Sequence, residues 1–296
     1  MDYLSRVLQA LREQTLPADR WEFIIVDNAS KPPLEGRLDL RGLPAARIVV
    51  ELKQGLSHAR RRGFQEARAD LIINLDDDTV LDRDYLERTV ELAVQYSFIG
   101  AFGCQIRAEF EQTPAWPALE YYAAERVIKQ DLWSNDPEHF ASMPWGTGSV
   151  VRKVVAEAYV VKLAKDERFA LLGRTAEKLL SCEDNEIALT ACDLGMGKGV
   201  FAELRLTHLI PIRRMSEEFL RKNTFGSAYS GTIHNYLRFQ KLPPKRSFFG
   251  KLNRIYRLLS AEPRKRKLAL AAESGCREAL RDMQEWGWLN ESSSQS

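Results

Sequence analysis

The sequence predicts an α/β protein in which a mostly parallel β-sheet is flanked by helices, followed by a helical C-terminal extension. Through the first hundred residues, short apolar runs rich in β-branched side chains alternate with stretches of helical periodicity. Acidic side chains follow two of these runs, at Asp27 and at the triplet Asp76–Asp78. Sheets of this kind bind ligands beyond the carboxyl ends of their strands, so we expect the functional site near these aspartates.

Helices and strands alternate along the N-terminal part of the chain. A helix is expected from Leu4 to Arg12, where apolar residues recur at helical spacing ahead of Pro17. Strands are expected at residues 21–26, 47–52, 71–75 and 99–106, and helices at residues 56–68 and 85–96. This alternation is the basis for predicting a largely parallel sheet with helices on both faces.

The pattern changes in the second part of the chain. Residues 109–144 are rich in aromatic residues and proline, which is typical of an irregular, substrate-facing insertion. Helices are expected at residues 150–165, 184–194 and 216–239, and Gly195, Gly197 and Gly199 are interpreted as a helix terminator because no strand precedes them. We therefore predict one domain over residues 1–214, a helical region over residues 215–290 and a disordered tail at residues 291–296.

Composition and charge limit the classes of function. The 296 residues are 45% hydrophobic and 28% charged, as in ordinary globular proteins, and the net charge of +2 gives no general attraction for nucleic acid. The four cysteines show no CxxC spacing, so a reducing cytoplasm is the expected location. No apolar run reaches the roughly 18 residues of a membrane-spanning helix, and no signal peptide is apparent.

One segment departs from this balanced charge. Residues 245–267 contain nine basic residues and one acidic residue, a formal charge of +8, interleaved with aromatic and aliphatic side chains. One interpretation places this segment on an anionic membrane surface, from the cytoplasmic side, near a lipid-linked or membrane-bound partner. The alternative is that its apolar stripe packs against the rest of the protein and leaves the charges in water. Binding of nucleic acid would leave the acidic residues of the chain unexplained.

The triplet Asp76–Asp78 follows an apolar run, and buried carboxylates are costly unless they are paired or bound to metal. If the extended geometry continues, Asp76 and Asp78 point to one side and Asp77 to the other. Two convergent carboxylates suit Mg²⁺ or Mn²⁺ that also holds a diphosphate. The alternative is a solvated loop, or a helix N-terminus at which aspartates cap free amides.

Five short motifs occur in one order along the chain. They are EFIIVDNAS at 22–30, QGLSHARRRG at 54–63, LDDD at 75–78, WGTGSVVR at 145–152 and CEDNEIAL at 182–189. Together they resemble glycosyltransferase family 2 over most of residues 4–214. The resemblance implies a GT-A fold with a nucleotide-sugar half at about residues 1–107 and an acceptor half at about residues 108–214. It also implies an inverting, metal-dependent transfer from a nucleotide diphosphate sugar, by default a UDP-sugar, to a saccharide or lipid-linked hydroxyl acceptor in polysaccharide or glycoconjugate synthesis.

The resemblance also implies roles for individual residues. It places Asp27 on the base, Arg60 near the base or phosphates, Asp76 on the ribose, Asp77, Gly146 and Gly148 in the donor site, Asp78 and His208 at the metal, and Asp184 with Glu183 at the catalytic position. A carboxylate at 184 can take the proton of an attacking hydroxyl. Other interpretations stay open: residues 181–184 fit a capping box, the glycines fit an ordinary turn, and His208 fits a structural histidine.

The sequence departs from the family pattern at one point. The family's usual chain has an apolar strand ahead of the helix that starts here at about Leu4, and this sequence has none. The true start lies upstream, another segment fills that place in the sheet, or the donor site is weakened. The main alternative function is therefore a non-catalytic or truncated nucleotide-sugar-binding remnant.

Overall fold

The computed structural model describes residues 3–114, 125–175, 179–244 and 247–289. The chain divides into two units: Met1–Glu167 with Glu183–Met215 form the first, and Arg168–Cys182 with Ser216–Ser296 form the second. The break at Met215 lies one residue beyond the boundary that the sequence suggests, and the segment before residue 183 belongs with the C-terminal helices. The predicted tail at residues 291–296 lies outside the described residues.

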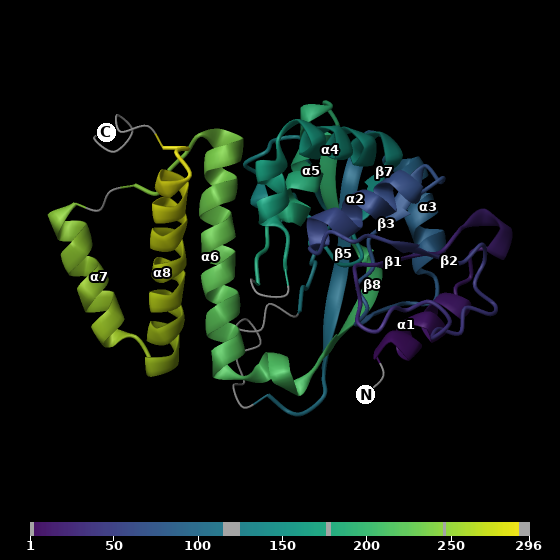
Figure 1. Ribbon diagram of the computed structural model, residues 1–296, viewed down its shortest axis with the longest axis horizontal. Helices are drawn as coiled ribbons and strands as arrows, with labels where there is room; N and C mark the ends of the chain where they lie inside the picture. Colours follow the sequence, from purple (N-terminus) through teal and green to yellow (C-terminus); the bar gives the residue numbers. More distant parts are fainter. Residues whose placement is uncertain (1–2, 115–124, 176–178, 245–246, 290–296) are drawn as a thin grey trace. The chain divides into compact units, whose positions relative to one another are not determined.

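The first unit contains both helices and strands (Figure 1). Its helices are α1 (Tyr3–Arg12), α2 (Leu56–Glu66), α3 (Tyr85–Gln95), α4 (Lys153–Lys165) and α5 (Glu183–Asp193). Its strands are β1 (Ile24–Asp27), β2 (Arg47–Val50), β3 (Leu71–Ile73), β4 (Thr79–Leu81), β5 (Ile99–Phe110), β6 (Leu132–Ser134), β7 (Val150–Arg152) and β8 (Gly197–Ile210). Short 3₁₀ turns lie at Ala18–Arg20, Phe140–Ser142, Glu167–Leu172 and Ile212–Met215.

Six strands form the main sheet, in the order β3-β7-β5-β8-β4, with β6 paired to β8 outside this path. Only β5 and β8 run parallel within it, while the β3–β7, β5–β7, β4–β8 and β6–β8 pairs are antiparallel. The α/β class with flanking helices is confirmed, but the pairing is mixed rather than mostly parallel. A parallel pairing of β3 with β4 would need a long crossover connection, and residues 74–78 between them are too few for one. The two strands instead stand at opposite ends of the sheet.

A second, smaller sheet consists of β1 and β2, which pair in parallel. β1 and β3 each lie at an end of their sheet, and no strand among the described residues connects the two sheets. In the part of the chain that the structure describes, no other segment therefore takes the place of the family's first strand.

Two predictions of local structure are wrong. Residues 150–152 form β7 rather than the first turn of a helix, because Val150 and Val151 are buried between β3 and β5. The sequence interpretation also overlooks β8, in which Gly197 and Gly199 are the first and third residues. Only Gly195, with a φ of 73°, has the left-handed conformation of a helix terminator after α5.

Apolar side chains fill the space between the main sheet and the helices α1 and α3. Phe102 of β5 and Leu206 of β8 are buried there against Leu8 of α1 and Leu92 of α3. On the other face, Val155 of α4 and Ala191 of α5 both approach β5, and α2 contacts α4. This packing fixes the ends of the strands, where the predicted site residues lie.

The second unit is helical, as predicted, and contains α6 (Glu217–Phe239), α7 (Phe248–Ser260) and α8 (Pro263–Glu285) (Figure 1). Ser216 caps α6 by accepting a hydrogen bond from the Phe219 amide. Contacts between α6 and α8 advance together, from Glu217 with Lys267 to Tyr229 with Asp282, so the two helices run in the same direction. α7 carries the chain back, and α8 contacts both α6 and α7. Among the described residues, no helix combines the length and apolarity needed to cross a membrane.

Candidate functional site

The aspartate triplet lies in the turn between β3 and β4 and not in a strand. Because β3 ends at Ile73, the expected alternation of side chains does not continue through residues 76–78. Asp78 is buried, Asp76 is half-buried and Asp77 is exposed. Asp76 lies near Arg60 and Asp78 contacts Arg214, as described below.

Hydrogen bonds join this turn to the glycine motif at residues 146–149. Asn74 accepts from the Gly148 amide at 2.7 Å and donates its own amide to the Ser149 carbonyl at 2.8 Å. The Asn74 side chain donates to Ser149 Oγ at 3.0 Å, and the hydroxyls of Thr79 and Thr147 are 2.8 Å apart. Two motifs that are 70 residues apart in sequence are thereby held as one rigid segment.

A buried ion pair connects α2 to α5. Arg60 Nη1 donates to Glu183 Oε2 at 2.7 Å, and the two side chains are 9% and 2% exposed. Arg60 Nη2 also lies 3.9 Å from Asp76 Oδ1. Glu183 Oε1 is buried and has no hydrogen-bond partner among the described residues. Burial raises the pKa of Glu183 to about 7, although the charge of Arg60 opposes the shift.

Asp184 lies beside this pair, next to Gly146. A Cβ added at Gly146 would stand 2.8 Å from Arg60 Nη2 and 3.2 Å from Asp184 Cβ. A side chain at this position would have to displace the Arg60 guanidinium, so glycine allows the close approach of the two segments. The structure thus brings Arg60, Asp76, Gly146, Glu183 and Asp184 together from four segments of the chain.

The capping box suggested by residues 181–184 is not formed. The Ser181 amide donates to Ser230 Oγ at 3.1 Å, and Ser181 Oγ donates to Ser227 Oγ at 3.2 Å. Neither group makes the reciprocal bonds of a capping box. Asp184 Oδ1 instead accepts from the neighbouring Asn185 amide, and its side chain is half-buried, which leaves it accessible to a ligand.

A second cluster forms around Asp78. Its Oδ2 is 2.8 Å from Arg214 Nη2, its Oδ1 is 3.6 Å from His208 Nε2, and Arg214 Nη1 is 3.1 Å from the same histidine nitrogen. Burial disfavours the charged form of Asp78, but the groups around it, the Arg214 guanidinium among them, outweigh this effect and lower its pKa. His208 reaches Asp78 because Thr79 and His208 are paired residues of β4 and β8.

The Asp78–His208 pair offers one carboxylate and one imidazole, a donor set that Mn²⁺ accepts. Among the described residues, no group of three His, Cys, Asp or Glu side chains is gathered as for a complete metal site. The pair therefore fits the type of site in which a few protein ligands are supplemented by substrate phosphates and water. The guanidinium of Arg214 already contacts both groups.

Two predicted donor-site residues have structural roles. Asp27 is buried, and its two carboxylate oxygens accept from the amides of Ser30 and Leu34, both at 2.9 Å. These bonds lower the pKa of Asp27, with the Leu34 amide as the largest cause. Gly148 has a φ of 70°, and a Cβ there would lie 2.3 Å from Leu206 Cδ2, so the fold itself requires glycine.

Sequence reasoning missed two arginines near the site. Arg214, described above, follows His208 by six residues, and the only signal was its place in a basic pair. Arg126 packs over the Trp145 ring, with 5.3 Å between Cζ and the ring centroid. Its Nη1 is buried without a hydrogen-bond partner among the described residues, and burial lowers its pKa. No motif pointed to Arg126.

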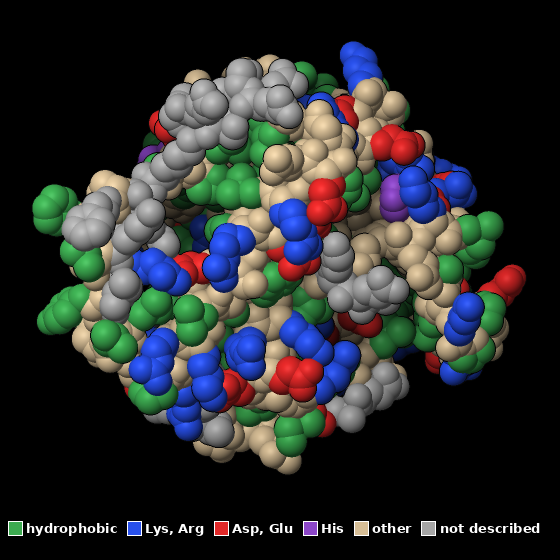
Figure 2. All heavy atoms as spheres, turned by 60° about the vertical axis from the view of Figure 1, so that its left-hand side comes forward, with side chains coloured by type: hydrophobic (Ala, Val, Ile, Leu, Met, Phe, Trp, Pro, Cys, Tyr) green, Lys and Arg blue, Asp and Glu red, His purple; other side chains and the backbone are tan. Residues whose placement is uncertain are grey.

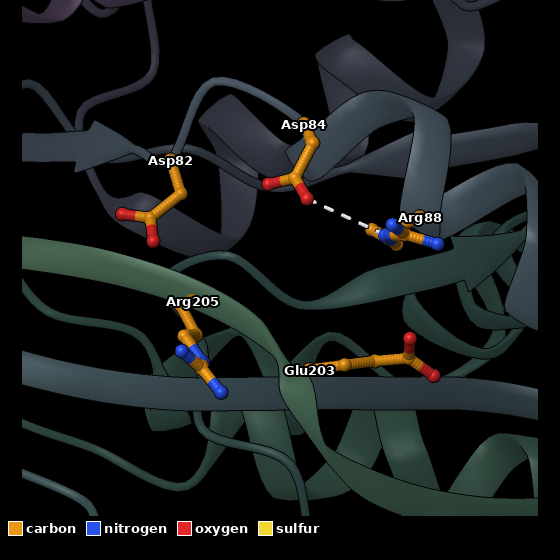
Figure 3. Close-up of a pocket in the computed structure, with 5 residues that line it drawn as sticks. All are labelled: Asp82, Asp84, Arg88, Glu203 and Arg205. Carbon is orange, nitrogen blue, oxygen red and sulfur yellow. Dashed lines mark hydrogen bonds and ion pairs between the residues drawn. The ribbon is translucent and has the colours of Figure 1, made fainter.

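A separate pocket of about 410 Å³ lies at the other end of β4 (Figure 3). Its lining residues are Asp82, Asp84, Arg88, Glu203 and Arg205. Asp84 and Arg88 form an ion pair one turn apart on α3, as the dashed line in Figure 3 shows. The pocket contains none of the predicted site residues, and it is lined by three acidic and two basic side chains.

Comparison with known proteins places the chain in a family. The sequence profile "Glycosyl transferase family 2" matches residues 1–159. A putative glycosyltransferase, EpsH of Bacillus subtilis, is 30% identical over 117 residues, which are 38% of this chain and 32% of that protein. The chain matches about a third of that relative's length. It belongs to glycosyl transferase family 2.

Two solved structures share the fold. The mannosyltransferase PcManGT of Pyrobaculum calidifontis, in complex with GDP-Man and Mn²⁺, matches with a TM-score of 0.54 at 16% identity, covering 96% of this chain and 71% of that one. S. aureus TarS 1-349 in complex with UDP-GlcNAc matches with a TM-score of 0.50 at 13% identity, covering 94% and 77%. At these identities the likeness shows the GT-A fold and not the substrate.

Proposed function

We propose that this protein transfers a sugar from a nucleotide diphosphate sugar to a hydroxyl acceptor with inversion at the anomeric carbon. The observation that carries the proposal is the cluster at the strand ends, where half-buried Asp184 lies beside Gly146 and the Arg60–Glu183 pair. The Ser181 amide that a capping box would offer to this carboxylate donates to Ser230 instead, and we take Asp184 as the group that accepts the proton of an attacking hydroxyl.

The donor class is inferred from the relatives. PcManGT holds GDP-Man and TarS holds UDP-GlcNAc, and we take a nucleotide diphosphate sugar as the common chemistry, with a UDP-sugar as the expected donor. Asp78 and His208 are the residues proposed to hold Mg²⁺ or Mn²⁺. Such an ion supplies positive charge against the departing diphosphate. Asp76 and Arg60 are proposed to bind the donor beside Asp184.

Asp184 can remain an effective base because the cluster has fixed geometry. Glu183 holds the Arg60 guanidinium from within the core, and the guanidinium stands next to Asp184 through the space left by Gly146. Groups positioned before substrate arrives need little rearrangement during reaction, which is the main source of electrostatic stabilisation in enzymes. The hydroxyl acceptor is proposed to be a saccharide or a lipid-linked sugar in polysaccharide or glycoconjugate synthesis.

A panel of UDP- and GDP-sugars with Mn²⁺ tests the donor proposal by thermal shift. A true donor at about 100 times its Kd should stabilise the protein by about 2.7 kcal/mol. The anomeric configuration of the product, followed by NMR with the stabilising sugar nucleotide, then tests inversion. A product that keeps the donor's configuration would contradict the inverting mechanism, and the absence of any stabilising nucleotide would contradict the donor site.

The separate β1–β2 sheet favours a second candidate, a nucleotide-sugar-binding protein without catalytic activity. Asp27 accepts from an amide of the loop that follows β1, and Asn28 donates to the Glu51 carbonyl after β2, so fewer polar groups remain for a donor base. This candidate predicts stabilisation by nucleotide sugars together with neither hydrolysis nor transfer. The thermal-shift and NMR experiments therefore separate the two functions.

We further propose that α7 rests on an anionic membrane surface on the cytoplasmic side. Phe249, Leu252, Tyr256 and Leu259 follow one another at helical spacing, and their exposed fractions are 79%, 48%, 70% and 72%. The face that Figure 2 brings forward shows hydrophobic and Lys or Arg side chains interspersed. Exposed aromatic residues beside basic residues match the interface of an anionic bilayer.

Ion pairs within the chain reduce the positive charge that this segment can offer to a membrane. Arg254 is paired with Glu273 and Lys267 with Glu217, so at least these two of the nine basic residues are paired within the chain. Residues 245 and 246 and the side chains of Phe248, Lys251 and Ile255 lie outside the described residues. Arg257 is the exposed basic residue of α7 on which the electrostatic part of the proposal rests.

A further inference from the structure

The side chain of Arg214 contacts both of the proposed metal ligands, Asp78 and His208. Arg214 contacts Asp78 Oδ2 at 2.8 Å and His208 Nε2 at 3.1 Å. A guanidinium has only donors, so His208 Nε2 is the acceptor and its lone pair points toward Arg214. The 3.6 Å between His208 Nε2 and Asp78 Oδ1 is too long for a hydrogen bond. Both groups that would hold a divalent ion are therefore engaged by one guanidinium.

The surrounding structure supports this arrangement. Asp78 is buried, and the Leu209 amide donates to its carbonyl at 2.8 Å, which fixes residue 78 against β8. A buried carboxylate needs a counter-charge, and Arg214 supplies it in the protein without ligand. Arg214 stands on the short 3₁₀ turn Ile212–Met215, with its side chain about one-fifth exposed. The guanidinium can therefore turn toward a ligand without a change in the strands.

We propose that Arg214 competes with the divalent cation for Asp78 and His208, so that metal binding at this site depends on the nucleotide diphosphate. This inference rests on the proposed donor-binding function. A metal ion that enters alone must break both contacts of Arg214 and leaves the guanidinium beside a new positive charge. A diphosphate offers that guanidinium paired oxygen acceptors and completes the oxygen ligands of the metal. Arg214 is then a donor-binding residue that no motif marks.

Mn²⁺ binding to the full chain, measured by electron paramagnetic resonance with and without UDP, tests the competition. Arg214→Gln is expected to bind Mn²⁺ alone about tenfold or more tightly than wild type, within the range by which groups around a metal ligand alter affinity. Arg213→Gln removes the same charge from the adjacent residue and is expected to keep the wild-type affinity. UDP should strengthen Mn²⁺ binding to wild type and have a clearly smaller effect on Arg214→Gln.

Equal Mn²⁺ affinities of wild type and Arg214→Gln in the absence of UDP would overturn the inference. The double variant Asp78→Asn with Arg214→Gln must lose the added affinity, and if it does not, Mn²⁺ binds elsewhere and the inference is wrong. If Arg214→Gln does not fold, Arg214→Lys replaces it, because lysine keeps the charge but cannot contact both groups as a fork. Arg214→Lys is then also expected to bind Mn²⁺ more tightly than wild type.

The same measurements separate this inference from the proposed function. If no nucleotide sugar stabilises any of these proteins, the donor site is contradicted, while the comparison with Mn²⁺ alone still decides the role of Arg214. If UDP-sugars bind wild type equally well with and without Mn²⁺, the donor site stands and the coupling between metal and diphosphate is wrong.

Discussion

Asp184 is the residue on which the proposed chemistry most directly depends. It is half-buried at the start of α5 and makes neither bond of a capping box with Ser181. Asp184→Asn keeps the size and polarity of the side chain but removes its ability to take a proton. We expect turnover to fall by roughly two to four powers of ten. Donor affinity, by calorimetry, and melting temperature should stay close to the wild-type values.

A loss of melting temperature with unchanged turnover per folded molecule would instead make Asp184 a structural residue. Asn185→Asp serves as a matched control, since it introduces a carboxylate at the adjacent position. It is not expected to restore activity when combined with Asp184→Asn.

Glu183 should make stability depend on pH in an unusual direction. Its pKa of about 7 in the folded protein lies above the value near 4.3 of an unfolded chain, so the folded state binds the proton more tightly. Its contribution to stability is complete below about pH 4 and is lost as pH rises through 7. The free energy of unfolding of Glu183→Gln, measured relative to wild type, should therefore rise between pH 5 and pH 8 by up to about 3 kcal/mol.

Urea unfolding at pH 5, 6, 7 and 8 measures this difference. Glu22→Gln is the control, because the pKa of Glu22 is lowered by its bonds to Arg47 and Arg68 despite the opposing effect of burial. That carboxylate is ionised in both states across this range, so the effect of its substitution should not change with pH. A similarly flat profile for Glu183→Gln would show that Glu183 is already ionised at pH 5.

At the scale of elements, α6 contains two glycines with different surroundings. A Cβ at Gly226 would lie 2.1 Å from the carbonyl oxygen of Leu179, whereas the nearest atom to a Cβ at Gly231 is Cys182 Sγ at 4.0 Å. Gly226→Ala should destabilise the protein by about 1–3 kcal/mol through this overlap. Gly231→Ala, on the same helix, should stabilise it by up to about 1 kcal/mol, because alanine is the better helix former.

Thermal unfolding of both variants, followed by circular dichroism, checks these two opposite changes in stability. If Gly226→Ala is as stable as wild type, the segment that contains Leu179 does not pack tightly on α6.

The element scale also explains how the predicted motifs come together. The LDDD and WGTGS motifs meet because β3 pairs with β7, and the bonds of Asn74 to Gly148 and Ser149 continue this pairing beyond the strand ends. His208 reaches Asp78 because β8 pairs with β4. Two strands that sequence interpretation assigned incorrectly, β7 and β8, therefore position much of the site.

At the scale of the whole molecule, a net charge of +2 is too small to hold the protein on a membrane by its overall field. Attachment must come from the local surface of α7. The full chain should sediment with anionic liposomes at low salt, stay in solution with neutral ones, and be released as salt rises. Arg257→Glu and the pair Phe249→Ser with Tyr256→Ser should each reduce binding.

Val94→Ser is the matched control for this experiment, because Val94 is 76% exposed but lies on α3, away from α7 in the sequence. It should bind liposomes as wild type does. If wild type remains in the supernatant with anionic liposomes at low salt, the membrane proposal is wrong and α7 has only a structural role.

Sequence pattern alone was enough to predict most helices and the strands β1, β2, β3 and β5. α1, α2, α3 and α6 lie within a few residues of the ranges expected from helical periodicity, because each buries one stripe of apolar side chains. The motifs also indicated the family and named the residues that meet at Arg60. These features depend on short stretches of chain, in which neighbours in sequence are neighbours in space.

The tertiary structure decided what depends on distant neighbours. β8 contains Gly197 and Gly199, which are poor strand formers, and it becomes a strand because it is buried beside β5 and β4. The roles of Glu183 and Arg214 follow in the same way from partners more than a hundred residues away, Arg60 and Asp78. Burial and charge at these positions come from the whole fold, so no local pattern in the sequence could reveal them.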